Sequence, residues 1–169
     1  DVVKRVDNLT RGIPKIIYLV GWQRGGHDHL YPDWSVVNPK LKREEDATAL
    51  ESLRWLICEA RAYNTTISLH INMVDAFEES PLWDTYIKND IIARDVNGNL
   101  KSIWEYVKGH RAYHLSYTKE WEKGFAKKRI DNLIGMVPEL KEGHTIHIDA
   151  FMAYWQPENR PLSPWHAKP

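Results

Sequence analysis

The sequence predicts an α/β fold with parallel strands, because three short strand-like segments alternate with two longer helical ones. Residues 15–20, 66–72 and 145–150 are short stretches rich in Ile, Leu and Val. Residues 44–63 and 119–137 carry apolar side chains at the spacing of one helix face. This order favours a parallel sheet with helices between its strands.

Each predicted element begins or ends at a recognisable local signal. The first strand follows the breaker Gly12-Ile-Pro14, and Asn64 is expected to end the first helix. Ser116 or Thr118 is a suitable N-cap for the second helix, and Pro138 ends it. In the second strand apolar and polar side chains alternate, so its polar side chains share one face.

A hairpin is predicted between the second strand and the second helix. Asn97-Gly98 is flanked by residues 91–95 and 100–103, which are compatible with two short antiparallel strands. Asn-Gly is the usual sequence of a type I′ turn. We expect this hairpin to be an excursion from the parallel sheet.

The loops that follow the strands are long, as expected for a barrel with a catalytic face. A closed (β/α)8 TIM barrel needs about 250 residues. We therefore expect a partial barrel of about three to four βα units. Residues 1–169 would belong to a single catalytic barrel, with its remainder beyond residue 169.

Composition excludes several classes of protein. The chain has 169 residues, 43% hydrophobic and 27% charged, which is enough apolar material for a core. Its 23 basic and 23 acidic residues balance, which argues against nucleic acid as a partner. No apolar run approaches the ~18 residues of a membrane span, so no membrane insertion is expected in this segment. Cys58 is alone, so no disulfide forms within the chain.

The aromatic residues are mostly Trp and Tyr, with few Phe. Eight Trp and eight Tyr accompany only three Phe. Tyr and Trp combine a flat apolar face with a polar group, which suits a sugar with apolar C–H faces and surrounding hydroxyls. The alternative is that these rings fill a core.

An acid ends the third predicted strand. In residues 144–151, Ile146 and Ile148 alternate with His147 and Asp149, so the last two share a face. The carboxyl ends of parallel strands carry the chemistry in α/β architectures. Asp149 is therefore a candidate nucleophile or base.

Polar and aromatic side chains follow all three predicted strands, where parallel strands would bring them to one face. They are Trp22, Gln23, His27, Asp28 and His29 after the first strand, His70, Asn72 and Asp75 at the second, and His147, Asp149, Tyr154 and Trp155 at the third. Two chemistries fit such a set.

In the first chemistry, a glycoside hydrolase, one carboxylate attacks the anomeric carbon and a second carboxylic acid protonates the leaving oxygen. Asp149 would be the nucleophile. Carboxylate, imidazole and amide groups bind sugar hydroxyls. The residues expected to do so are Trp22, Gln23, His27, Asp28, His70, Asn72, His147 and Tyr154.

In the second chemistry, a metal-dependent hydrolase, His27-Asp28-His29 would supply ligands that His70, His147 and Asp149 complete. No H-x-x-x-H, H-E-x-x-H or C-x-x-C spacing is present. We therefore favour the glycosidase and expect neither a metal nor another cofactor. Each polar residue could instead have a purely structural role. Asp149, for example, could cap a helix, and His147 could be a hydrogen-bonded core residue.

Three segments together resemble glycoside hydrolase family 101, the endo-α-N-acetylgalactosaminidases. Residues 21–34, with Gly-Trp-Gln followed by Gly-His-Asp, are similar to its first motif, and residues 67–76, with His-Ile-Asn, to its second. Residues 147–151 lie where the family has the strand that carries its nucleophile. The three occur in the family's order and span about residues 15–155. The related α-N-acetylgalactosaminidase family 129 is a close second.

The resemblance implies a (β/α)8 catalytic domain that hydrolyses α-linked N-acetylgalactosamine (GalNAc) of mucin-type O-glycans with retention. It implies Asp149 as the nucleophile, Asp28 as a ligand of sugar hydroxyls, and His27, His70 and Asn72 as parts of the pocket wall. It also implies an extracellular, cell-surface or periplasmic protein.

The chain departs from the family pattern in places. Phe151 replaces a tyrosine, His147 an aromatic residue and Ser68 a glycine. The family's acid/base glutamate is expected beyond Pro169, in the rest of the same catalytic domain. The rival interpretation is a carbohydrate-binding barrel without catalysis.

Overall fold

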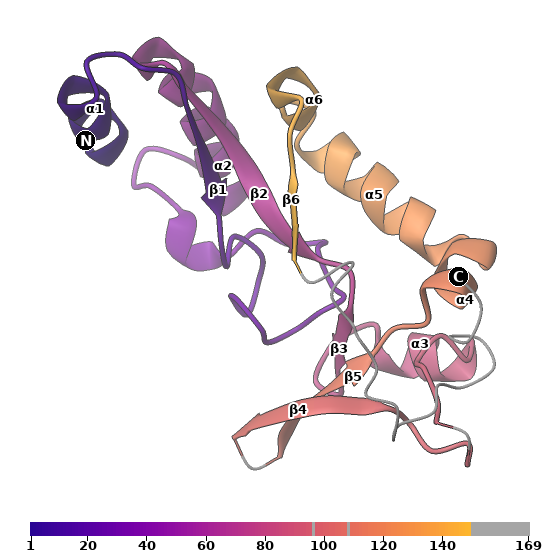
Figure 1. Cartoon of the computed structure of the whole chain (residues 1–169). Coiled ribbons are helices and arrows are strands. Elements are labelled where there is room, and N and C mark those ends of the chain that lie inside the picture. The colour runs from indigo at the N-terminus through magenta and orange to yellow at the C-terminus, as the bar shows by residue number, and fades with distance from the viewer. Residues whose placement is uncertain (96, 108, 150–169) are drawn as a thin grey trace. The chain divides into compact units, whose positions relative to one another are not determined.

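The computed structural model describes residues 1–95, 97–107 and 109–149 (Figure 1). The chain divides into two compact units, which are described separately. Unit 1 comprises Asp1–His27, Trp34–Ile71 and Asp131–His147. Of the described residues, unit 2 comprises those of Asp28–Asp33 and Asn72–Ile130, together with Ile148 and Asp149.

A parallel pair of strands forms the centre of unit 1. Strand β1 (Lys15–Leu19) pairs with β2 (Thr65–Asn72) in parallel, with Lys15 opposite Thr65 and Leu19 opposite Leu69. Strand β6 (His147–Asp149) completes the order β1-β2-β6 (Figure 1). The three predicted strands and the mixed α/β class are confirmed, although β6 is shorter than the predicted segment.

The helices of unit 1 follow the expected order, with shifted ends. They are α1 (Val2–Leu9), the 3-10 turn η1 (Pro39–Leu41), α2 (Ala49–Ala60), the 3-10 turn η2 (Arg61–Tyr63) and α6 (Leu140–Gly143). Helix α2 begins later than predicted, because Thr48 caps it by accepting a hydrogen bond from the Glu51 amide at 3.2 Å. Asn64 ends the helical segment in the left-handed region, at φ 50°.

Unit 2 contains an antiparallel sheet that the sequence did not predict. Strands β3 (Asp75–Phe77), β4 (Ser102–Val107) and β5 (His110–His114) lie in the order β3-β5-β4. The predicted turn at Asn97-Gly98 is present, since the Gly98 amide donates to the Asp95 carbonyl at 3.0 Å. The longer ladder, however, joins β4 and β5.

The second predicted helix is interrupted. Unit 2 contains α3 (Trp83–Lys88) and α4 (Tyr117–Glu122), and α5 (Phe125–Met136) begins in unit 2 and ends in unit 1. Ser116 caps α4 as predicted. The break between α4 and α5 lies at Gly124, whose φ of 76° does not continue a helix.

A buried ion pair anchors the core of unit 2. Arg129 lies 2.8 Å from a carboxylate oxygen of Glu120, and the two side chains are 6% and 1% exposed. The Tyr86 hydroxyl donates to Glu120 at 2.7 Å, and Arg129 donates to the Pro32 carbonyl at 3.2 Å. Burial raises the pKa of Tyr86, so its hydroxyl keeps the proton that it donates. These partners satisfy the charges that burial would otherwise penalise.

Burial in unit 1 is uneven across the sheet. Residues 67–71 of β2 are all buried, so the central strand is covered on both faces. Ile16 and Val20, in and just after β1, are 55% and 57% exposed, and Ile146 is 37% exposed. Among the described residues, no helix is both long and apolar enough to cross a membrane.

Candidate functional site

The loop after β1 is built on glycines and held by buried side chains of unit 1. A side chain at Gly21 would place its Cβ 3.1 Å from the His27 amide nitrogen, and Gly21 has a φ of 71°. Gln23 is 1% exposed and donates to the Gly26 carbonyl at 2.8 Å. The buried Trp22 donates from Nε1 to the His70 carbonyl at 2.9 Å. This packing leaves the His27 side chain exposed.

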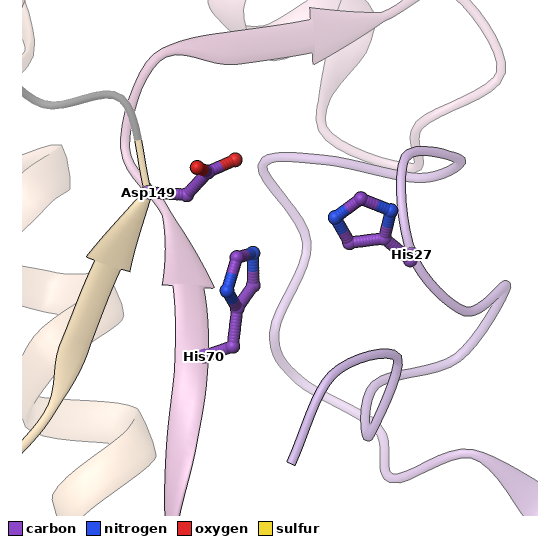
Figure 2. A group of neighbouring side chains, drawn as sticks. All are labelled: His27, His70 and Asp149. Atoms are coloured by element: carbon purple, nitrogen blue, oxygen red, sulfur yellow. The ribbon is translucent and has the colours of Figure 1, made fainter. Parts of the chain in front are cut away.

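Three imidazoles lie close together in unit 1. His70 and His147 approach with their Nδ1 atoms 2.9 Å apart, so one ring donates and the other accepts. The ring centroids of His27 and His70 are 5.3 Å apart, and those of Tyr18 and His147 are 5.5 Å apart. Figure 2 shows His27 on the loop and His70 on β2. These predicted residues therefore form one cluster of hydrogen-bonding groups and rings.

The turn after β2 is organised by Asn72 in unit 2. Its Oδ1 accepts from the amides of Val74 and Asp75, both at 2.8 Å, and its Nδ2 donates to Asp75 Oδ2 at 2.8 Å. Asn72 is 1% exposed and Asp75 is 5% exposed. The predicted sugar ligand Asn72 therefore has a role within the chain, which is to fix the carboxyl group of Asp75.

Three carboxyl groups interact in unit 2. Burial, above all, raises the pKa of Asp75 to about 7, opposed by the hydrogen bond from Asn72 and reinforced by the charges of Asp28 and Asp149. Asp28 follows β1, Asp75 follows β2 and Asp149 ends β6. Asp28 and Asp149, two of the residues that the sequence selected, therefore both act on Asp75 within unit 2.

The sequence placed Asp75 among the polar side chains at the end of the second strand but assigned it no role in the site. Its position three residues after Asn72 at a strand end was a usable signal. The sequence could not reveal that burial and two neighbouring carboxylates would let Asp75 keep a proton near neutral pH.

The predicted metal triplet His27-Asp28-His29 does not act as one unit. His27 is paired with His70, whereas the ring of His29 stacks on His110 with 5.0 Å between centroids. Of the three described side chains drawn in Figure 2, His27 and His70 belong to unit 1 and Asp149 belongs to unit 2. Tyr154 and Trp155 lie outside the described residues.

Comparison with known proteins places the chain in a family. Residues 1–162 match the family model described as endo-alpha-N-acetylgalactosaminidase, glycoside hydrolase family 101. No curated protein matches the chain significantly.

Solved structures with a similar fold include two of the alpha-N-acetylgalactosaminidase NagBb from Bifidobacterium bifidum. The ligand-free form has a TM-score of 0.59 at 15% identity, covering 94% of this chain and 24% of that one. The GalNAc complex has a TM-score of 0.54 at 15% identity, and the match covers 85% of this chain and 20% of that one.

A GH31 family sulfoquinovosidase from E. rectale, in complex with an aza-sugar inhibitor, has a TM-score of 0.50 at 16% identity. The match covers 79% of this chain and 19% of that one. At these identities the likeness concerns the fold alone, and this chain spans about a fifth to a quarter of the length of these structures. The family match covers nearly the whole chain, and the chain therefore belongs to the endo-α-N-acetylgalactosaminidase family of glycoside hydrolases.

Proposed function

We propose that the protein containing this chain is a retaining glycosidase that hydrolyses α-linked GalNAc in mucin-type O-glycans. The observation that carries the proposal is that Asp28, Asp75 and Asp149 of unit 2 lie close enough for the charges of Asp28 and Asp149 to act on Asp75, and that Asp149 ends β6. Hydrolysis of a glycosidic bond needs an ionised carboxyl group, which this cluster supplies in the proposal, and a protonated one, which the rest of the catalytic domain supplies. The family match supplies the expected sugar, and its fold relatives include structures with GalNAc and with an aza-sugar inhibitor.

Asp149 is the nucleophile in this proposal. It ends β6 (Figure 2) and attacks the anomeric carbon as a carboxylate. The C–O bond to the aglycone breaks while an acid supplied by the rest of the catalytic domain protonates the leaving oxygen. Water then releases the sugar with its original anomeric configuration.

The remaining predicted residues bind the sugar in this scheme. Asp28 and His27 accept or donate hydrogen bonds to ring hydroxyls, and Trp22, Gln23, His70 and His147 shape the wall around them. Asn72 contributes indirectly by holding Asp75, and Tyr154 keeps its predicted role as a sugar ligand.

We further propose that unit 1 is part of a (β/α)8 barrel completed by other segments of the same protein. The exposed Ile16, Val20 and Ile146 support this, because isoleucine and valine at strand positions usually pack against a neighbouring element. The fold relatives are four to five times longer than the matched region. An extracellular or cell-surface location is proposed from the family alone, and cell fractionation tests it.

Replacement of Asp149 in the full-length protein tests the proposed function. With p-nitrophenyl α-GalNAc and a core-1 disaccharide conjugate as substrates, Asp149→Asn is expected to lower kcat by about 10³-fold or more. Asp84→Asn is the matched control, because Asp84 is an exposed acid in α3. Added azide should rescue Asp149→Ala and give a glycosyl azide of inverted configuration.

Retention of substantial turnover by Asp149→Ala without azide would refute the proposed nucleophile. The non-catalytic alternative predicts a different pattern, in which the wild-type full-length protein binds the glycan but releases no sugar.

A further inference from the structure

His110 lies at the start of β5 in unit 2, with its ring held between two other rings. Its centroid is 4.6 Å from that of Phe77, with the planes 8° apart, and 5.0 Å from that of His29, with the planes 24° apart. The His110 side chain is 14% exposed. Stacking on both neighbours fixes the plane of the imidazole, and with it the directions of its two nitrogens.

Both nitrogens of His110 face groups that only accept hydrogen bonds. Nδ1 lies 3.0 Å from Glu79 Oε1, and Nε2 lies 3.0 Å from the Asp28 carbonyl oxygen. An ionised carboxylate and a carbonyl oxygen carry no proton to donate. A neutral imidazole has one N–H and can satisfy one of these acceptors, so both hydrogen bonds form only when His110 is an imidazolium.

The charges around His110 agree with this protonation state. Burial acts to lower the pKa of His110, but the hydrogen bond to the Asp28 carbonyl and the charges of Glu79 and Asp28 outweigh it and raise the pKa. Burial likewise acts to raise the pKa of Glu79, but the bond from His110 outweighs it and lowers the pKa. His29 is the other titratable group against the ring, while Arg111, next to His110 on β5, pairs with Glu105 of β4.

We propose that His110 is a positioning residue that clamps the loop carrying Asp28 and so aims the Asp28 carboxylate at the sugar. Asp28 has a φ of 53°, in the left-handed region that L residues seldom adopt, so its backbone needs an external hold. His110 supplies that hold from a distant part of the chain. The inference rests on the proposed function only for the role of Asp28 toward the sugar.

The pH dependence of the clamp follows from the raised pKa of His110. A histidine whose pKa is raised on folding gives its full contribution below its ordinary value of about 6.5. The contribution disappears as the pH rises through the higher folded value. The clamp is therefore closed in mildly acidic solution and opens in alkaline solution.

Two readouts on the full-length protein test the clamp. The first is hydrogen–deuterium exchange of peptides covering residues 21–33, each variant compared with wild type at the same pH. The second is KM and kcat for p-nitrophenyl α-GalNAc from about pH 5.5 to about pH 9, a range that brackets an ordinary histidine pKa. The variants are His110→Gln and His110→Phe, the latter keeping the stack on Phe77.

The expected results separate a clamp from a general loss of structure. In wild type, loop exchange and KM should rise together through the alkaline transition. In His110→Gln and His110→Phe, both should already be high at low pH and independent of pH, with KM raised about tenfold, as for one lost charge-assisted hydrogen bond. The kcat value should change by less than about threefold, because His110 does not touch the reacting atoms.

Glu79→Gln keeps an acceptor but removes its charge, so it should move the transition to lower pH. Glu78→Gln is the matched control, because Glu78 accepts from the Tyr113 hydroxyl instead. The proposal is wrong if wild type and His110→Gln show the same loop exchange at every pH. It is also wrong if Glu79→Gln leaves the pH transition of loop exchange unmoved. The second test remains available even if the His110 variants fail to fold. If the protein shows no α-GalNAc activity, the proposed function fails while loop exchange still decides the clamp.

Discussion

In unit 1, Trp22, His70 and His147 beside the parallel strands are joined by hydrogen bonds, whereas unit 2 buries an ion pair and a carboxyl group. The Trp22 indole donates to the His70 backbone carbonyl, and the His70 and His147 rings share a hydrogen bond. Unit 2 contains the buried Arg129–Glu120 pair and the proton-retaining Asp75. Neutral hydrogen bonds tolerate burial at small cost, but a buried charge depends on its partner. Substitutions should therefore have larger effects, and stronger pH dependence, in unit 2.

The largest effect on stability is expected from breaking the buried ion pair of unit 2. Arg129→Met should lower the free energy of unfolding by about 3–5 kcal/mol, because it leaves Glu120 buried without its partner. Arg54→Gln in unit 1 is the matched control, since Arg54 is 45% exposed in its pair with Glu139 and should matter by at most about 1 kcal/mol.

Urea unfolding of both variants in the full-length protein, monitored by hydrogen–deuterium exchange of peptides from each unit, measures the difference in their free energies of unfolding. Equal effects of the two substitutions would remove the contrast between the units.

The second effect is a pH dependence caused by Asp75. Because its pKa is raised to about 7 in the folded protein, the folded state binds more protons than the unfolded state between about pH 4 and about pH 7. Stability should therefore fall as the pH rises through this window, by up to ~1.4 kcal/mol per pH unit, and level off above it.

Asp75→Asn should abolish that slope and stabilise the protein in neutral solution. Urea midpoints measured at acidic and neutral pH for wild type, Asp75→Asn and the surface control Asp84→Asn would detect it. A slope that persists in Asp75→Asn would assign the proton to another group.

The smallest effect is expected in unit 1. Trp22→Phe keeps most of the buried ring but removes the Nε1 hydrogen that the His70 carbonyl accepts. The loss should be about 2 kcal/mol of stability, because it combines a neutral hydrogen bond with the buried ring atoms that Phe lacks, and it should not depend on pH. Thermal unfolding across the pH range measures this, and an effect as large as that of Arg129→Met would show that unit 1 also depends on one dominant contact.

The site residues that could be inferred from the sequence are those with a local signal, and those that depend on distant partners could not be inferred. The positions of Asp149, Asp28 and His70 could be inferred, because a strand end and a Gly-rich loop are visible over a few residues. No role could be inferred for Asp75 or His110, because their properties depend on neighbours far along the chain. His110 and Asp28, for example, are separated by 82 positions.

The sequence by itself determined the strands of the parallel sheet, the caps at Asn64 and Ser116, and the acid that ends β6. Periodicity and capping act over one or two turns of chain, so they can be read locally. Only the tertiary structure decided the β4–β5 ladder, the break at Gly124, the Arg129–Glu120 pair and the proton on Asp75. Each depends on burial or on a distant partner, and the free energy of a charge is set by those surroundings.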